Sequence, residues 1–416
     1  MNSFLLPTWR RNVLAIVVAA LSAPAIAAPL SFEEALQLAE RNSPSLVAED
    51  ARLEAARQAA IPAGELPDPK LILGLNNVPI AGNNRFSLRS EQMTSQQVGL
   101  AQEVPNSAKR RARVEVAQST IERVVAERRI EQLKVRRETA LAWIKRYTVE
   151  RKLGLFDELY RENHLLAEAV RIRVASGQGL AMDTILPRQE AVTLADRHDQ
   201  LERQLSDAKA GLRYWIGKAG DEPLIGALPN WSIMPATLER NLDEHPELRV
   251  FNSITRQAEA EVHKAESEKK SDWGVQLVYQ RRPDYADMAS VQFTFDLPVF
   301  AARRQDPQIA SKQAELIRID AQRGATVREP SQILATDLAA YPQLGRSVQR
   351  QQASQLPVEK EKVDLALAAY RSGKIELTTV IAARSEWIDA RLQLIDLDGQ
   401  RSLMAARLHY AYQENK

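Results

Sequence analysis

The stretch from Asn106 to Leu186 limits how this chain can fold more than any other, because it runs for 81 residues without a proline. Apolar residues recur in it at spacings of three or four, the period of an α-helix, as at Val114, Ala117, Ile121 and Val124. A continuous helix over residues 106–176 would be ~105 Å long at ~1.5 Å per residue. Gly177 and Gly179 then interrupt the pattern, which resumes beyond them. The sequence therefore predicts a very long helical hairpin with its tip at Gly177.

The first 27 residues have the pattern of a signal peptide. Arg10 and Arg11 precede an apolar run of 11 residues that is too short to span a bilayer as a helix. The small-x-small sequence Ala25-Ile26-Ala27 predicts cleavage after Ala27, so that the mature chain begins at Ala28. A retained membrane anchor is the alternative.

Composition argues against chemistry in this chain. It contains no cysteine, which excludes disulfides, thiolate metal ligands and a lipid-bearing cysteine, so we expect a non-lipidated protein. Its five histidines and six methionines are scattered, and we expect no metal site and no cofactor. A net charge of +2 gives no reason to expect a nucleic-acid partner. The sequence lacks a phosphate-binding glycine loop and a nucleophile-base motif, so we do not expect an enzyme.

The rest of the chain is a tandem repeat. The block VGLAQEVP at 98–105 recurs as VQFTFDLP at 291–298, and Ser176-Gly177 recurs as Ser372-Gly373, an offset of 196. Each repeat has the pattern helix, strand, strand, long helix, tip, helix, with first helices expected at 31–60 and 237–268. The predicted organisation is a signal peptide (1–27), a first repeat (28–216), a linker or equatorial segment rich in glycine and proline (217–235) and a second repeat (236–416).

The predicted strands alternate apolar and polar residues. In the second repeat the apolar series is Trp273, Val275, Leu277 and Tyr279 on one strand, and Val291, Phe293, Phe295 and Leu297 on the next. A soluble sheet can show this pattern, but the runs also suffice for spanning strands of roughly 9–11 residues. Four strands cannot close a barrel, so spanning strands would require several chains to share one. The second long helix differs from the first because it carries Pro330, Pro342 and Pro357, and we expect it to be bent or segmented.

These features resemble the TolC family of outer-membrane efflux channels. The resemblance rests on the duplication and on three stretches: LPDPKL at 66–71, QEVP at 102–105 and YRSG at 370–373. It implies a mainly α fold with a small β part, in which long coiled-coil hairpins form a periplasmic α-barrel. It also implies a homotrimer in the outer membrane, with four transmembrane strands per chain in a twelve-stranded barrel.

The family resemblance further implies a passive exit duct that extends into the periplasm and contacts outer-membrane lipid. Its partners would be a periplasmic adaptor and an inner-membrane pump of the resistance-nodulation-division (RND) class. The segments 67–79 and 87–93 are similar to the CzcC- and CusC-like heavy-metal-efflux branch, which favours heavy-metal cations as cargo. Drug efflux and type I secretion through the same fold are alternatives. A soluble periplasmic coiled-coil scaffold or adaptor is a third.

Both hairpin tips are candidate sites for adaptor docking. By the resemblance, the docking residues are Ser176, Gly177, Gly179, Leu180, Tyr370, Arg371, Ser372, Gly373 and Leu377. Tyr370 matches a family tyrosine that ties neighbouring helices together in the closed state. The family's acidic constriction residues are replaced here by Thr379 and Ala382. Asp183 could instead supply a negative ring at the pore, or it could simply stabilise a helix N-terminus.

Overall fold

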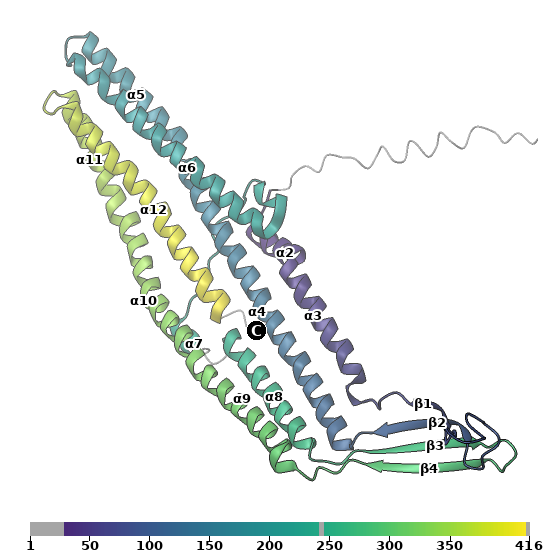
Figure 1. Cartoon of the computed structure of the whole chain (residues 1–416). Helices are drawn as coiled ribbons and strands as arrows, with labels where there is room; N and C mark the ends of the chain where they lie inside the picture. The colour runs from purple at the N-terminus through teal and green to yellow at the C-terminus, as the bar shows by residue number, and fades with distance from the viewer. Residues whose placement is uncertain (1–28, 241–244, 413–416) are drawn as a thin grey trace, which may run out of the picture. The chain divides into compact units, whose positions relative to one another are not determined.

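The computed structural model describes residues 29–240 and 245–412, so the predicted signal peptide and its cleavage site lie outside the described residues. The fold is mainly α with a small β part, as expected (Figure 1). The helices are α2 (Phe32–Asn42), α3 (Pro44–Ala60), α4 (Ser107–Leu153), α5 (Phe156–Ala175), α6 (Leu186–Ile216), α7 (Pro235–Arg240), α8 (Pro246–Ser267), α9 (Gln305–Thr326), α10 (Arg328–Arg350), α11 (Leu356–Arg371) and α12 (Leu377–Tyr412). The strands are β1 (Lys70–Asn76), β2 (Ser95–Val104), β3 (Trp273–Arg281) and β4 (Met288–Phe295).

The first helical segment begins with a capping box. The Ser31 backbone N–H donates to Glu34 Oε2 at 2.9 Å, and the Glu34 N–H donates to Ser31 Oγ at 3.3 Å. The single helix expected over 31–60 is wrong, because the chain forms two helices separated at Ser43. Ser43 has extended dihedral angles (φ −70°, ψ 115°), as the ring of the following Pro44 disfavours a helical conformation in the preceding residue.

The second long rod is segmented, as its prolines predict. It consists of α9, α10 and α11, with a π-helical turn at Gln351–Gln355 between the last two. Pro330 and Pro357 lie in the first turns of α10 and α11, where a missing N–H costs little, and Pro342 lies inside α10. In the first rod a short turn separates α4 from α5.

The chain divides into two compact units that cut across the sequence repeats. Counting only the described residues, unit 1 comprises 29–42, Glu138–Asn230 and Ser347–Leu403, and unit 2 comprises Ser43–Arg137, 231–240, 245–346 and 404–412. Each unit therefore draws segments from both repeats.

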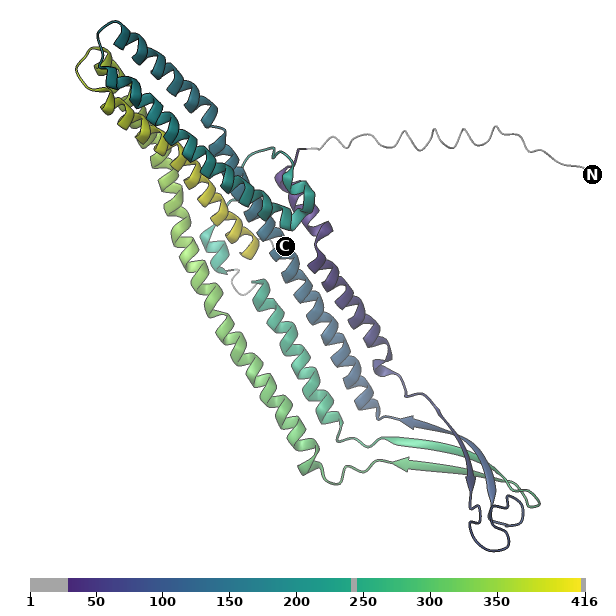
Figure 2. The same cartoon turned by 45° about the horizontal axis from the view of Figure 1, so that its top comes forward.

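Unit 1 contains two helical hairpins, α5–α6 and α11–α12, whose tips lie at the same end of the unit (Figures 1 and 2). One apolar cluster packs between α5, α6 and α12 and contains Phe156, Leu159, Leu194, Leu201 and Ile388. A second cluster, nearer the tips, contains Leu166, Val170, Tyr370, Leu377 and Val380. The hairpins are thus joined by burial of apolar side chains along their length.

A buried arginine fixes the segment that follows α6. Arg146 on α4 is only 1% exposed, and its guanidinium donates to the carbonyls of Gly220 and Glu222, both at 2.7 Å. Its Nε donates to Glu150 at 2.7 Å, so the buried charge is paired as well as hydrogen-bonded.

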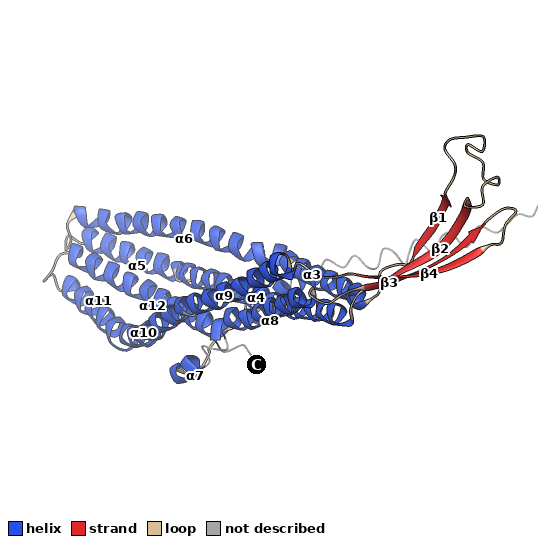
Figure 3. Cartoon of the chain, turned by 60° about the horizontal axis from the view of Figure 1, so that its bottom comes forward, coloured by secondary structure: helices blue, strands red, loops and turns tan. Residues whose placement is uncertain are grey.

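Unit 2 contains the sheet and the helices that lead into and out of it. The four strands are antiparallel in the order β1-β2-β3-β4, so the hairpins of the two repeats pair through β2 and β3 (Figure 3). All four strands occupy segments in which apolar residues alternate, since Leu71, Leu73 and Leu75 in β1 and Val98 and Leu100 in β2 show the same pattern as the second repeat. The β1–β2 and β3–β4 loops lie at the same end of the sheet, because the strands are antiparallel and in register.

A buried histidine packs beside the apolar cluster of unit 2, which contains Leu238, Leu334, Leu408 and Tyr412. His245 precedes α8, is 8% exposed, and lies with its ring centroid 5.1 Å from that of Tyr412. The Tyr412 hydroxyl donates to the Pro330 carbonyl at 3.0 Å. Burial lowers the pKa of His245 and the charge of Arg137 lowers it further, while Glu247 acts in the opposite direction.

Acid should therefore weaken unit 2 through His245. Its folded-state pKa lies below the unfolded value of about 6.5, so this stability is complete above that pH and is lost as the pH falls towards the folded pKa. We expect His245→Phe to reduce the pH slope of the unfolding free energy by up to ~1.4 kcal/mol per pH unit. Urea unfolding in detergent at about pH 7.5 and pH 5.5 measures it. His164→Asn, on an exposed face of α5, is the control, and equal slopes in wild type and His245→Phe would contradict the prediction.

Candidate functional site

The sheet of unit 2 exposes a row of large apolar side chains along one of its faces. The pairing register places one set of apolar side chains on a single side, and we call this set the apolar face: Leu71, Leu73, Leu75, Val98, Leu100, Trp273, Leu277, Tyr279, Val291, Phe293 and Phe295. Its members are open to solvent in the single chain, with Leu73 71% and Phe293 59% exposed. Several residues of the opposite face are more covered, and Val278 is only 8% exposed. A contiguous exposed apolar surface of this kind marks contact with a membrane or another protein.

A buried lysine stabilises the junction between strands and helices. Lys109, near the start of α4, is 6% exposed and its Nζ lies 2.9 Å from Asp272 and 3.2 Å from Glu268. Burial disfavours the charged amine, but its two carboxylate partners outweigh this and raise the pKa of Lys109. The Asn106 backbone N–H also donates to Asp272, at 2.7 Å. Lys109 is the first residue of the basic run KRRAR at 109–113, and its ion pairs with Glu268 and Asp272 connect the two repeats.

Each hairpin tip in unit 1 ends its helix with the same hydrogen bonds. Gly177 donates to Val174 and Gln178 to Arg173, both at 3.0 Å, and the corresponding bonds at Gly373 and Lys374 are both 2.9 Å. This is the Schellman motif, which requires a left-handed residue after the helix. Gly177 has φ +75° and Gly373 φ +73°, so both tips need glycine.

One side-chain network connects the two tips. The Arg173 guanidinium lies over the Tyr370 ring, with Cζ 4.4 Å from the centroid, and Nη1 donates to the Tyr370 carbonyl. The Tyr370 hydroxyl lies 3.3 Å from Asp183 Oδ2 and donates to it. Burial and the nearby Asp183 carboxylate raise the pKa of Tyr370, which keeps the hydroxyl protonated as the donor. Asp183 Oδ2 also accepts the Leu180 N–H at 3.2 Å, as expected of an acidic residue in a first helical turn.

The remaining predicted tip residues fall into two groups. Ser176, Gly177, Leu180, Arg371, Ser372, Gly373 and Thr379 are exposed, and Gly179 is partly exposed. Leu377 is fully buried and Tyr370 is 7% exposed, both in the cluster that joins the hairpins. These two side chains therefore support the tips from inside and do not present themselves to a partner from this chain.

A buried charged network lies behind the tips, and no sequence pattern predicted it. Arg384 on α12 donates to Glu190 on α6 at 3.0 Å, and Asn163 on α5 donates to the same carboxylate at 2.9 Å. All three side chains are buried. Arg384 also borders a groove of about 590 Å³ lined by α5, α11 and α12. Charged residues on long helices normally face solvent, so only the structure identifies these as internal.

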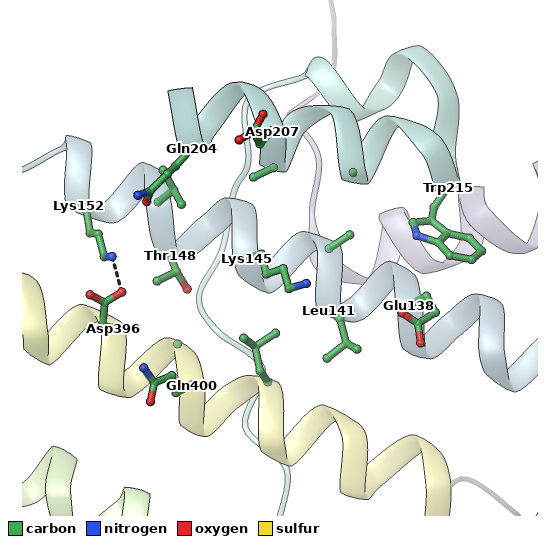
Figure 4. Close-up of a pocket in the computed structure, with 16 residues that line it drawn as sticks. Glu138, Leu141, Lys145, Thr148, Lys152, Gln204, Asp207, Trp215, Asp396 and Gln400 are labelled. Atoms are coloured by element: carbon green, nitrogen blue, oxygen red, sulfur yellow. Dashed lines mark ion pairs between the residues drawn. The ribbon is translucent and has the colours of Figure 1, made fainter. Parts of the chain in front are cut away.

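A second hollow, of about 550 Å³, lies between α4, α6 and α12 in unit 1 (Figure 4). Trp215 lies at one end of it, and Lys152 forms an ion pair with Asp396 across α4 and α12. The two helices approach closely here, because a Cβ on Gly399 would lie 2.5 Å from Thr148 Oγ1. Small residues, Ala142, Ala208, Gly211 and Gly399, form part of the lining of the hollow.

The described residues include one trio of possible metal ligands, His198, Asp199 and Glu202 on α6, with ligand atoms within 4.8 Å of one another. Two of the three are exposed, and His198 lies 3.9 Å from Glu202, an ordinary separation for side chains four apart on a helix. This geometry does not assign a metal site. Among the described helices, none is both long and apolar enough to cross a membrane.

Comparison with known proteins relates the fold to a group of channels. No protein-family model and no curated protein matches the sequence. Among solved structures, CusC, described in connection with transmembrane channel formation, superposes with a TM-score of 0.77 at 14% identity over 91% of each chain. The outer membrane protein VceC of Vibrio cholerae gives 0.74 at 17%, covering 91% of this chain and 95% of its own. The outer membrane channel MtrE of Neisseria gonorrhoeae gives 0.72 at 17%, covering 91% and 88%. The chain therefore has the fold of these outer-membrane channels.

The glycine requirement at the tips is testable by stability measurements. Gly373→Ala places a Cβ on a left-handed residue and should lower the unfolding free energy by ~1–2 kcal/mol. Gly211→Ala lies inside α6 with open space around the added Cβ, and should raise it by ~1 kcal/mol. Urea unfolding of both variants gives the comparison, and a stabilising Gly373→Ala would contradict the tip geometry.

Proposed function

We propose that this chain is a TolC-family exit duct in the outer membrane, the passive channel component of a tripartite efflux system. The observation that carries the proposal is the exposed apolar face of the sheet. A lipid environment would cover it, whereas a soluble periplasmic scaffold would leave it in water. Trp273 and Phe295 pair at one end of this face and Tyr279 lies at the other, which resembles the aromatic girdles of spanning barrels.

The sheet also supports assembly as a homotrimer. Within residues 29–240 and 245–412, β1 and β4 each have one side without a strand partner. An open edge is not tolerated in hydrocarbon, so neighbouring copies must supply the missing hydrogen bonds. Three chains with four strands each would close a barrel of twelve.

The tips are the proposed contact with a periplasmic adaptor that connects the duct to an inner-membrane RND pump. The exposed tip residues would meet the adaptor directly, while Tyr370 and Leu377 hold the two hairpins together behind them. The groove between α5 and α11 continues this surface away from the tips.

The hydrogen bonds of Asp183 are compatible with a role in the gate. Its carboxylate accepts the Leu180 N–H at the start of a helical turn and also the Tyr370 hydroxyl of the second hairpin, so Asp183 can stabilise the helix N-terminus and also contribute to the pore constriction. In a trimer, three copies of Asp183 near the axis would form a negative ring, with Thr379 as a neutral neighbour.

Heavy-metal cations remain the proposed cargo because of the sequence similarity at 67–79 and 87–93. The fold does not separate branches, since CusC, VceC and MtrE match it about equally well. Drug efflux and type I secretion therefore remain alternatives within the same proposal. The driving energy would come from the pump.

Two neighbouring residues on opposite faces of β3 test the membrane assignment. Leu277→Arg places a charge on the apolar face and should abolish outer-membrane trimers, since Arg near the bilayer centre costs ~2–4 kcal/mol per chain. Gln276→Arg carries the same charge on the opposite face and should still assemble. Native sizing of detergent-extracted membranes measures this. Equal recovery of both variants, or monomers soluble without detergent, would refute the proposal.

The gate is tested in planar bilayers and the cargo in cells. Asp183→Asn should reduce cation selectivity in planar bilayers while trimers persist, because it removes the ring charge but retains a hydrogen-bond acceptor. A strain lacking the chain should become sensitive to Cu, Ag, Zn, Co or Cd salts and regain resistance with the wild-type protein. Sensitivity to organic drugs alone would replace metal export by drug efflux, and unchanged selectivity would remove Asp183 from the gate.

A further inference from the structure

The face of the sheet opposite the apolar face has an unusual composition, and we call it the amide face. Its residues are Ile72, Gly74, Asn76, Ser95, Gln97, Gly99, Ala101, Gly274, Gln276, Val278, Gln280, Met288, Ser290, Gln292 and Thr294. Lys70 and Glu103, at the end nearest the helices, are the only charged residues on this side of the four described strands, and they form an ion pair with each other. The rest of this face carries mainly amides, hydroxyls and small residues, with Ile72, Val278 and Met288 as its larger apolar side chains.

The register brings the amides together in rows. Gln276 lies opposite Gln292 on β4, and Gln97 lies opposite Gln280 on β3. The Asn76 side chain donates to Gln97 Oε1 at 2.7 Å. Amides both donate and accept hydrogen bonds, so these rows remain well hydrated without carrying a fixed charge.

Three glycines on the amide face let neighbouring atoms lie close to the sheet backbone. A Cβ at Gly74 would lie 2.7 Å from the Gln97 side chain and one at Gly274 2.9 Å from Thr294 Oγ1, so these two glycines accommodate a neighbouring side chain. A Cβ at Gly99 would lie 2.5 Å from the Leu277 backbone oxygen and 2.9 Å from Val278 Cγ2, so this glycine also permits close approach of the neighbouring backbone. All three glycines are on the amide face, which leaves space above it.

We propose that the amide face lines an electrically neutral exit section, which passes cations and anions alike; the inference rests on the proposed barrel. A fixed charge inside a narrow pore attracts ions of opposite sign and repels the others. Apart from the Lys70–Glu103 pair at one end, the described strands offer no such charge to the lumen. Selection by charge would then occur at the tips or in the pump, and the exit section would not restrict cargo to metal cations.

The absence of cysteine from the sequence permits a direct measurement. Single cysteines are placed at Gln276 and, as a matched control, at Leu277 on the apolar face. Purified trimers in lipid vesicles are treated with two methanethiosulfonates, one carrying a trimethylammonium group and one a sulfonate. The rate ratio of the two reagents, divided by the ratio for mercaptoethanol, reports the local potential.

We expect Gln276→Cys to react with both reagents, with a corrected ratio within about twofold of one. Leu277→Cys should react at least about tenfold more slowly with both, because charged reagents do not enter hydrocarbon. Adding Gln292→Glu to Gln276→Cys puts a carboxylate on the cross-strand neighbour and should shift the ratio towards the cationic reagent by about threefold or more.

The outcomes distinguish a charged lumen from the absence of a barrel. A corrected ratio beyond about tenfold for Gln276→Cys would show a charged lumen and overturn the inference while leaving the barrel intact. A ratio near one that does not respond to Gln292→Glu would show that Gln276 does not face a confined lumen, and would also overturn it. Failure to recover trimers, or equal reactivity at 276 and 277, would instead refute the barrel.

Discussion

Backbone hydrogen bonding at the edges of the four-stranded sheet is the constraint on which the rest of the structure depends. In the part of the chain that the structure describes, β1 and β4 each leave one row of N–H and C=O groups without a strand partner. Water can satisfy such groups, but hydrocarbon cannot, and each unsatisfied group there costs several kcal/mol. The apolar face favours transfer into lipid, whereas the unpaired edges disfavour it for a single chain. Association with further copies, as proposed above, would satisfy both requirements.

Much of the fold could be predicted because its elements carry local signals. Period-two alternation identified the strands, and the glycines after the long helices identified both tips. The prolines of the second rod predicted its segmentation. The first helix was predicted as one continuous segment over 31–60, because helical apolar spacing continues on both sides of Pro44. The prediction missed that Pro44 holds Ser43 in an extended conformation and so ends the first helix before it.

The contacts behind the tips could not be predicted, because they depend on which helix faces which. Arg146, Arg384 and Glu190 have the sequence pattern of ordinary surface charges, yet they are buried and paired. The repeat offset equates Arg173 with Ala369, so two tips with the same backbone hydrogen bonds differ in side chains. Of this equivalent pair, Arg173 lies over the ring of Tyr370 on the other hairpin, whereas the alanine at 369 has no side chain long enough to make the reciprocal contact.

The open sheet edges also have a genetic consequence. If the trimeric barrel closes only when all three chains have intact edge strands, a chain that inserts correctly but carries an altered edge strand would prevent closure of every trimer that it joins. When intact and altered copies are made in equal amounts and mix at random, only about one trimer in eight contains three intact chains. Lesions in β1 or β4 would then be dominant over a normal copy in the same cell. Lesions that prevent the chain from leaving the aqueous compartment would be recessive, because such chains never meet the others.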